Sequence, residues 1–275
     1  MRKRPLNWTP CGPAGAGDRG ETGLAPGPGE TLDCLSGHWK IFQLERGHRY
    51  STDDLLVAWF AVSWLTERRI AAATHLDLGC GVGSVGLLAL WRLPELRLVG
   101  VEAQDVSVGL ARRSVRHNGV EDRAEIRLGD FRSPGLLGPR ERFDLITASP
   151  PYLVDGEGQR SLGPQRGPCR FEDRGGAAGY LEVAAAHLAS GGAVVWAHAT
   201  RHLETNLRTA SAVGLGSVLW RRVVFREGKE SLITLFRAQG GSSVPLEGTP
   251  LVVRRRDRSW SDEYRRIRGE MGFPC

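Results

Sequence analysis

Short apolar runs alternate with amphipathic stretches through most of the chain. The apolar runs predict buried strands, and they cover the start of 75–85, then 97–102, 124–128, 143–148 and 193–197. Between and after them, apolar residues recur at helical spacing over 85–93, 105–117, 177–189 and 200–213. This regular alternation predicts an α/β fold with a mostly parallel sheet and helices on both of its faces.

The two ends of the chain differ from this pattern. Residues 1–34 are rich in glycine and proline and show no periodic apolar face, so they predict a disordered tail. We expect residues 35–240 to form one domain. Within it, two strand-like runs at 217–225 and 231–237 predict an antiparallel hairpin at the end of the sheet. Residues 241–275 form a basic extension, in which four arginines could bind phosphate or form a solvated tail: Arg254, Arg255, Arg256 and Arg258.

The sequence HLDLGCGVGSV, residues 75–85, predicts a strand that turns sharply into a helix. Glycines are needed there because the backbone must adopt positive φ and approach a ligand closely. The turn contains Gly79, Cys80, Gly81 and Gly83, and Asp77 precedes it at the end of the strand. The glycine spacing alone also fits a dinucleotide site, so the neighbouring residues must decide between the two.

Acidic residues follow the next two predicted strands. Glu102, with Ala103 beside it, ends the run 97–102, where a carboxylate can accept hydrogen bonds from both hydroxyls of a ribose. Asp130 and Phe131 follow the run 124–128. An ordinary solvated strand end would explain each of them taken alone.

The run 143–148 ends in Ser149-Pro150-Pro151-Tyr152. Open α/β sheets bind ligands at the carboxyl ends of their strands, and two prolines stiffen the backbone there. A serine hydroxyl and the Pro150 carbonyl offer two acceptors to a planar amine, on whose ring Tyr152 can stack. Positioning of this kind needs neither a metal nor a covalent nucleophile.

Together, these segments resemble class I S-adenosylmethionine-dependent methyltransferases that carry an (Asn/Asp/Ser)-Pro-Pro-(Tyr/Phe/Trp) motif. The resemblance implies a Rossmann-like, seven-stranded sheet with helices on both faces, and S-adenosylmethionine as cofactor. It implies that Asp77, the glycine turn and Glu102 hold the cofactor, with Asp130 on the adenine amine and Phe131 against the ring. It also implies methyl transfer to adenine N6, cytosine N4 or a glutamine amide.

The segment before the glycine turn narrows the resemblance. After a predicted strand at 38–44, residues 43–56 resemble the entry segment of the bacterial tRNA(Val) adenine-N6 methyltransferase family. That likeness implies Arg49, Tyr50 and Thr52 as further cofactor-pocket residues, although a helix cap and core face explain the same letters. The resemblance also makes Arg170, in the basic loop after Tyr152, a substrate-binding candidate.

One residue departs from the adenine-N6 pattern, because Ser149 stands where asparagine is usual. A hydroxyl can still accept from an amine, so we predict an N-methyltransferase that acts on an exocyclic amine of a nucleobase, first of all adenine N6 in tRNA. The alternatives are a cytosine-N4 or protein glutamine methyltransferase, or a non-catalytic RNA-binding protein with the same fold. RNA, and tRNA first, is the expected partner.

Composition adds little to these predictions. The net charge of +6 favours an anionic partner, and no apolar run is long enough for a membrane span. The five cysteines are scattered and form no paired metal spacing, as in proteins with reduced thiols. We therefore expect a cytoplasmic protein without a metal and leave its oligomeric state open.

Overall fold

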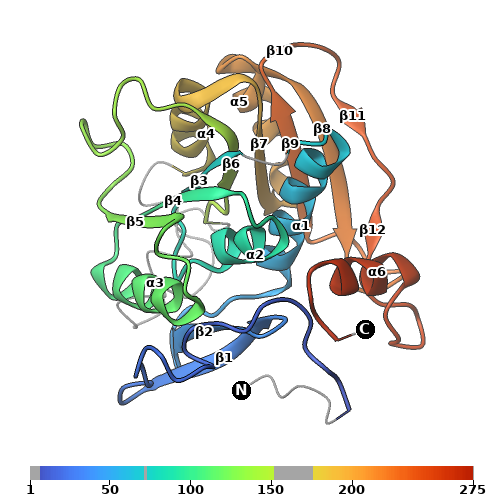
Figure 1. Ribbon diagram of the computed structural model, residues 1–275. Helices are drawn as coiled ribbons and strands as arrows, with labels where there is room; N and C mark the ends of the chain where they lie inside the picture. The colour runs from blue at the N-terminus through green and yellow to red at the C-terminus, as the bar shows by residue number, and fades with distance from the viewer. Residues whose placement is uncertain (1–6, 71–72, 152–175, 275) are drawn as a thin grey trace.

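The computed structural model describes residues 7–70, 73–151 and 176–274, and its centre is one sheet (Figure 1). The main strands lie in the order β5-β4-β3-β6-β7-β9-β8. Their bounds are β3 (Thr74–Leu78), β4 (Arg97–Glu102), β5 (Ala124–Leu128), β6 (Phe143–Ala148), β7 (Leu188–Ala199), β8 (Leu215–Val224) and β9 (Ile233–Gln239). Neighbours from β5 to β7 are parallel, whereas β9 is antiparallel to β7 and β8. The predicted α/β fold, with its mostly parallel sheet and closing hairpin, is confirmed. In the described part of the chain the sheet has ten strands instead of the predicted seven, because three short C-terminal strands also pair with β8.

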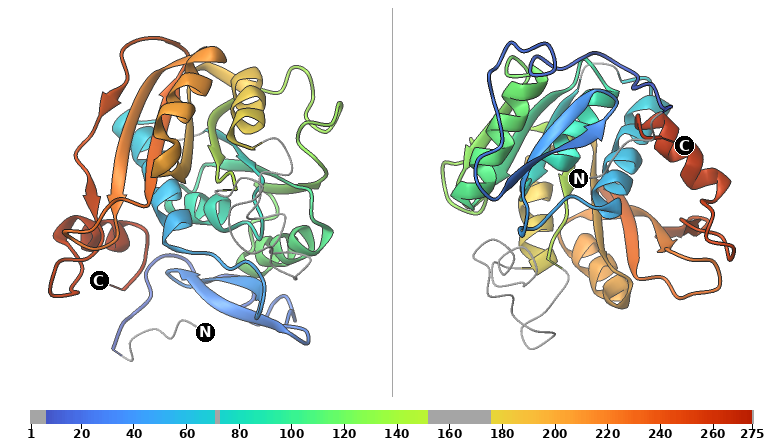
Figure 2. Two further views of the ribbon diagram at one scale, coloured as in Figure 1. Left: turned by 180° about the vertical axis from the view of Figure 1, so that it is seen from behind. Right: turned by 90° about the horizontal axis from the view of Figure 1, so that it is seen from below.

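Helices cover both faces of the sheet (Figure 2). One face carries α1 (Thr52–Glu67), α2 (Ser84–Arg92) and α3 (Asp105–Asn118). The other carries α4 (Gly176–His187) and, after a short 3-10 turn at Thr200–His202, α5 (Leu203–Ala212). Each face has its own cluster of buried apolar side chains. The sheet is therefore covered on both sides, and ligands reach it at the strand ends.

Helix α1 is deeply buried. Ser51 is its N-cap, and Ser51 and Asp54 form a reciprocal capping box. Its buried side chains include Val57, Phe60 and Trp64 as well as Leu55, Leu56, Ala58, Trp59, Val62 and Leu65. The helix is covered almost all round because it packs against the sheet and α2 together.

A separate antiparallel hairpin, β1 (Glu30–Ser36) and β2 (Trp39–Leu44), lies against α3 (Figure 1). The Phe42 N–H donates to the Ser114 hydroxyl at 2.9 Å. Order thus begins before residue 35, and the described part of the predicted tail also contacts α3. The Gly17 N–H donates to the His117 carbonyl at 2.7 Å, and a Cβ on Gly17 would collide with that imidazole. The high glycine and proline content of this segment predicted disorder. Close contacts of its backbone with α3, and not an apolar face, hold it in place.

The C-terminal extension continues the sheet edge and closes on the hairpin. Short strands β10 (Gly241–Ser242), β11 (Leu246–Glu247) and β12 (Leu251–Val252) each pair in parallel with β8. Helix α6 (Asp262–Glu270) follows, and beyond it the Gly272 carbonyl accepts from the Gly37 N–H at 2.8 Å. The two ends of the described chain therefore meet beside α6.

One predicted boundary is misplaced. The sequence predicts that Gly191 and Gly192 separate α4 from β7, but α4 ends at His187 and β7 begins at once. The glycines lie inside the strand, where its pairing with β6 is irregular. In the part of the chain that the structure describes, every helix is too short or too polar to cross a membrane.

Candidate active site

The glycine turn after β3 has the geometry that its sequence predicts. Gly79, Gly81 and Gly83 have φ of +65°, +56° and +85°, a region that L side chains rarely adopt. The Gly83 N–H donates to the Cys80 carbonyl at 2.8 Å and closes the turn. A Cβ on Gly81 would point into open space, whereas one on Gly79 would lie 2.6 Å from the Tyr180 hydroxyl. The turn therefore needs glycine and presents bare backbone to its surroundings.

A pocket lies over this turn, at the carboxyl ends of β3 to β6. It encloses about 890 Å³, counting space open to solvent. The predicted site residues that line it are Tyr50, Gly79, Cys80, Gly81, Glu102, Ala103, Asp130, Phe131, Ser149 and Pro151. The lining residues that sequence reasoning missed are His48, Asp54, Val82, Ser84, Gln104, Gly176 and Tyr180.

Asp77 lies beneath the turn and does not line the pocket. The Thr147 hydroxyl donates to its Oδ1 at 2.7 Å, and the Gly86 N–H donates to its Oδ2 at 3.2 Å. Burial raises the pKa of Asp77 to about 7. We expected this carboxylate to touch the cofactor, but the structure uses it to tie β3 to β6 and α2. Gly83 likewise shapes the turn without lining the pocket.

The contacts of Asp77 continue to a buried histidine. The Thr147 hydroxyl donates a hydrogen bond to Asp77, so His75 Nε2, 2.7 Å from the Thr147 oxygen, is the donor to that oxygen. Burial lowers the pKa of His75 to about 3, which keeps the imidazole neutral. This chain stiffens the floor under the glycine turn.

Glu102 stands where the sequence places it, at the end of β4. Its Oε2 accepts from the Gly81 N–H at 3.0 Å, and its Oε1 accepts from the Gln104 N–H at 2.7 Å. Both bonds hold the carboxylate at the mouth of the glycine turn. The predicted acid is therefore in position to meet a ligand's hydroxyl groups.

Asp130 and Phe131 line the pocket after β5. Asp130 forms an ion pair with Arg132 at 2.6 Å. The Phe131 ring lies 4.5 Å from the Tyr180 ring, centroid to centroid. These two rings, one from a predicted residue and one from α4, provide an aromatic wall.

Asp54 supplies a carboxylate that the sequence did not single out. The Ser51 N–H donates to its Oδ2 at 2.7 Å as part of the α1 cap. The Ser84 hydroxyl, at the start of α2, donates to its Oδ1 at 2.8 Å. The capping-box signal could have located Asp54, but its place in the pocket depends on the contact between α1 and α2.

Of the entry-segment candidates, only Tyr50 reaches this pocket. Arg49 forms an ion pair with Asp33 and donates to the Leu44 carbonyl at 3.0 Å, so its guanidinium holds the β1–β2 hairpin. Thr52 lines a second cavity, which Tyr50 also lines. Arg49 and Thr52, which the resemblance suggested for the cofactor pocket, therefore do not line this pocket.

The Ser149-Pro150-Pro151 segment forms one edge of the pocket. Among the described residues, no group forms a hydrogen bond with the buried Ser149 Oγ. The Pro151 carbonyl accepts from His198 Nε2 at 3.1 Å, while Asn206 Nδ2 donates to His198 Nδ1 at 2.8 Å. Burial lowers the pKa of His198 to about 4, so the ring stays neutral and keeps this tautomer.

Two predicted site residues, Tyr152 and Arg170, lie outside the described residues. His198 and Asn206 went unpredicted because they act on the loop from β7 and α5, far along the chain. Their contacts fix the prolines in place, as the motif requires.

The pocket is chemically suited to a cationic ligand. Asp54, Glu102 and Asp130 line it, and its described lining contains neither arginine nor lysine. No group of three or more His, Cys, Asp or Glu side chains in the described ranges is placed to hold a metal ion. The site is therefore surrounded by carboxylates, glycine backbone and two aromatic rings. At its edge, the Ser149 hydroxyl has no hydrogen-bond partner among the described residues.

Comparisons with known proteins give the family context. Residues 55–164 match the methyltransferase small domain family. A tRNA1(Val) (adenine(37)-N6)-methyltransferase of Aeromonas hydrophila is 28% identical over 218 residues, 78% of this chain and 86% of the relative. One from Bacteroides thetaiotaomicron is 31% identical over 133 residues, 45% of this chain and 51% of the relative. A ribosomal protein uL3 glutamine methyltransferase of Bradyrhizobium diazoefficiens is 34% identical over 110 residues, 40% of this chain and 32% of the relative.

The chain spans only about a third to a half of the length of several of these curated relatives. Solved structures cover more of it. An Agrobacterium tumefaciens protein described as a predicted O-methyltransferase matches 81% of this chain and 98% of its own, with a TM-score of 0.63 and 18% identity. A Thermus thermophilus 16S rRNA N2 G1207 methyltransferase, solved with AdoMet and guanosine, matches 77% of this chain and 50% of its own, with a TM-score of 0.52 and 19% identity. The chain has the class I methyltransferase fold, and its residues 55–164 match the methyltransferase small domain family.

Proposed function

We propose that the protein transfers the methyl group of S-adenosylmethionine to the N6 amine of an adenine in tRNA. The observation that carries this proposal is the buried Ser149 Oγ, which faces the pocket edge and has no partner among the described residues. A buried hydroxyl without a partner is costly, so a ligand amine that donates to it is favoured.

The pocket residues suit the parts of this cofactor. The backbone of Gly79 and Gly81 would accommodate it closely, and Glu102 would accept from its ribose hydroxyls. Asp130 and Phe131 would meet the adenine. Asp54, which sequence reasoning missed, would lie on the side of its ammonium and sulfonium charges. The charge of the pocket supports these assignments, because its described lining contains three carboxylates and no lysine or arginine.

The acceptor side needs orientation more than chemical activation. When bound, S-adenosylmethionine supplies a methyl carbon that is already attached to a good leaving group. Ser149 Oγ and the Pro150 carbonyl would accept from the two amine hydrogens and orient the nitrogen lone pair toward that carbon. Tyr152 would stack on the base. The amine proton released on transfer passes to water, and S-adenosylhomocysteine leaves.

The relatives favour RNA over protein as the target. The Aeromonas tRNA methyltransferase matches most of both chains, whereas each glutamine methyltransferase matches about a third of its own length. A match over most of both chains extends beyond the cofactor-binding domain. A match over a third of a chain can arise from that domain alone.

Labelled S-adenosylmethionine tests the target directly. The protein is incubated with unmodified tRNA, ribosomal RNA, DNA or cell protein, and the products are digested and separated. We expect N6-methyladenosine from tRNA. Label in cytosine or in protein would overturn the assigned target, and no label despite cofactor binding would favour a non-catalytic RNA-binding protein.

Ser149 provides a sharper test of the acceptor. Ser149→Ala should lower kcat about tenfold, the worth of one hydrogen bond of roughly 1.4 kcal/mol, and leave cofactor affinity unchanged. Ser149→Asn restores an acceptor and should recover most of the rate. Equal activity of Ser149→Ala and the wild type would exclude the hydroxyl from amine binding.

A further inference from the structure

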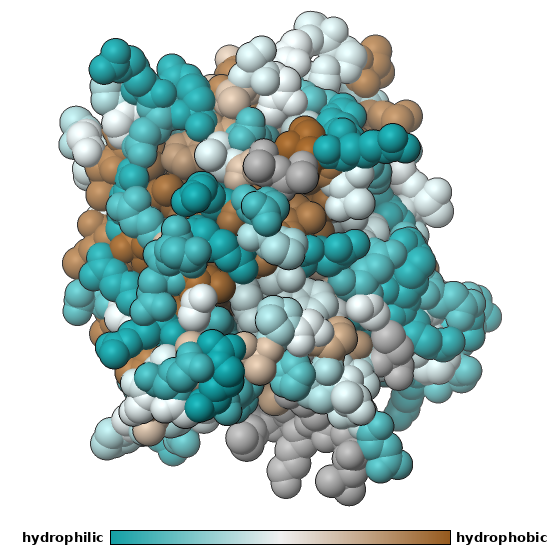
Figure 3. Space-filling view, in the orientation of Figure 1, coloured by the Kyte–Doolittle hydropathy of each residue, from teal (hydrophilic) through white to brown (hydrophobic). Residues whose placement is uncertain are grey.

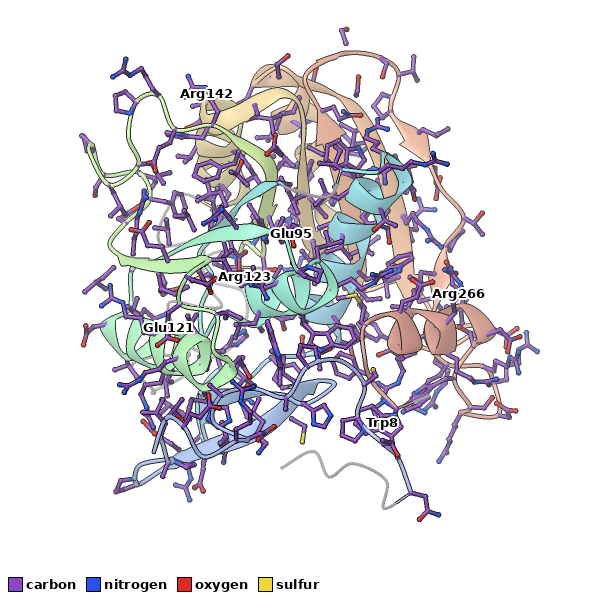
Figure 4. The ribbon with its side chains drawn as sticks, in the orientation of Figure 1. Trp8, Glu95, Glu121, Arg123, Arg142 and Arg266 are labelled. Carbon is purple, nitrogen blue, oxygen red and sulfur yellow. The ribbon has the colours of Figure 1, made fainter. Side chains whose placement is uncertain are left out.

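A second cavity lies on the other side of Tyr50, which lines both cavities. Its walls come from distant parts of the chain: the segment around Trp8, the end of β1, the turn after β8, and residues 253–274. It encloses about 1,510 Å³, counting space open to solvent. Figure 4 labels Trp8, on the N-terminal segment beneath α6, and Arg266, on α6 itself. This cavity lies where the two chain ends meet.

The lining of this cavity is aromatic and basic. Its ring side chains are Trp8, Tyr50, Phe225, Trp260, Tyr264 and Phe273, and its charged side chains are Arg226, Arg254 and Arg268. Among the described residues that line it, none is acidic. Aromatic faces stack on nucleobases, and arginines bind phosphate or stack on a base themselves. The set matches a nucleotide better than an apolar segment of protein.

Arg268 is held in a defined place within this set. Its guanidinium lies 3.8 Å from the centroid of the Trp260 ring, and its Nε donates to the Pro274 carbonyl at 2.8 Å. The Trp260 and Tyr264 rings meet edge to face at 6.2 Å. Such contacts order long side chains before any ligand arrives, which lowers the entropic cost of binding.

Arg226 adds an available positive charge at the turn between β8 and β9. It is exposed, and within the described ranges its side chain forms no hydrogen bond or ion pair. The surrounding surface over β11, β12 and α6 is mostly hydrophilic, on the right of Figure 3. A phosphate at the cavity mouth would therefore meet the Arg226 guanidinium.

From the shared Tyr50 wall and this lining, we infer that the second cavity binds a nucleotide of the RNA substrate near the base that is methylated. This inference rests on the proposed function. The base would stack in the aromatic part, with Arg226 and Arg254 on the flanking phosphates. Tyr50 would then separate the bound nucleotide from the cofactor pocket.

The test measures RNA binding and methyl transfer separately. The probe is a pool of unmodified tRNA transcripts, with the cofactor pocket saturated by S-adenosylhomocysteine during the binding measurement. Arg226→Ala should weaken binding severalfold and reduce the slope of log affinity against log salt by about 0.7–0.9. Trp260→Leu keeps an apolar side chain but removes the stacking face, and should weaken binding about tenfold.

Arg266→Ala is the matched control. Arg266 is an exposed residue of the same helix, pairs with Glu270 at 2.7 Å, and does not line the cavity. Like Arg226→Ala, the Arg266→Ala variant removes one positive charge, but it should leave RNA affinity within twofold of the wild type. S-adenosylhomocysteine affinity should be unchanged in all three variants, which also shows that they are folded.

The outcomes separate the two proposals. If the wild type methylates RNA but Arg226→Ala and Trp260→Leu bind it normally, the second cavity is not an RNA site and the proposed function stands. If Arg226→Ala and Arg266→Ala weaken binding equally and Trp260→Leu does not weaken it, a diffuse charge effect replaces a defined site. If the wild type labels only protein, the proposed function fails and this inference with it.

Discussion

The two cavities that share Tyr50 have opposite chemistry. The pocket over the glycine turn is lined by three carboxylates and, in its described part, by no arginine or lysine. The cavity beside α6 is lined by three arginines and, in its described part, by no carboxylate. Elements of the central sheet build the first, whereas the chain ends build much of the second. The sign of the lining charge therefore distinguishes the proposed site for a cationic cofactor from the proposed site for a polyanion.

The largest effect is expected from the removal of Glu102, the acid at the end of β4. Glu102→Ala loses the carboxylate and both of its backbone contacts, to Gly81 and Gln104. Hydrogen bonds to a charged group contribute about 1.5–3 kcal/mol each, so the Kd for S-adenosylmethionine should rise about 100-fold by calorimetry. RNA affinity should not change. A normal cofactor Kd would mean that the acidic pocket is not the cofactor site.

Substitution of His198 tests whether the position of the Ser149-Pro150-Pro151 segment affects kcat without affecting cofactor or RNA binding. His198→Ala removes the donor that holds the Pro151 carbonyl. A displaced loop should lower kcat about tenfold or more, with cofactor Kd and RNA affinity unchanged. His198→Gln can still donate and should recover part of the rate. Equal losses in kcat and cofactor affinity would point to general damage and would remove His198 as a positioning residue.

The smallest effect concerns the buried acid beneath the turn. Burial raises the pKa of Asp77 to about 7, so between pH 4 and 7 the folded state holds a proton that the unfolded state releases. The contribution of Asp77 to stability therefore falls as pH rises through this window. Relative to Asp77→Asn, the wild type should lose roughly 1–2 kcal/mol of unfolding free energy between pH 6 and 8, by urea denaturation. A flat difference between the two curves would show that the folded carboxyl titrates normally.

Local patterns predicted the fold and much of the first pocket. The glycines at 79, 81 and 83 and the acid at 102 could be located because a strand, a tight turn and a helix leave signals in consecutive residues. The cap at Ser51 is equally local. These features form over short distances, so their sequence patterns are sufficient.

Features that depend on distant contacts escaped prediction. Asp54 and Ser84 meet only because α1 packs on α2, and Tyr180 reaches Gly79 from α4. Asp77 was expected in the pocket but is held beneath it by Thr147, 70 residues away in the chain. Arg49 was expected beside the cofactor but pairs with Asp33 of the hairpin. In each case a partner from another element decides where the side chain lies.

Tyr50 gives the molecule a route for thermodynamic linkage. Its hydroxyl donates to the Cys34 carbonyl at 2.6 Å, so the residue is anchored to β1 while it borders both cavities. Binding coupling between two sites is reciprocal. If filling one cavity shifts this shared side chain and changes affinity in the other by some factor, the reverse order of binding must produce the same factor. A single tyrosine would then set whether cofactor and RNA favour or exclude one another.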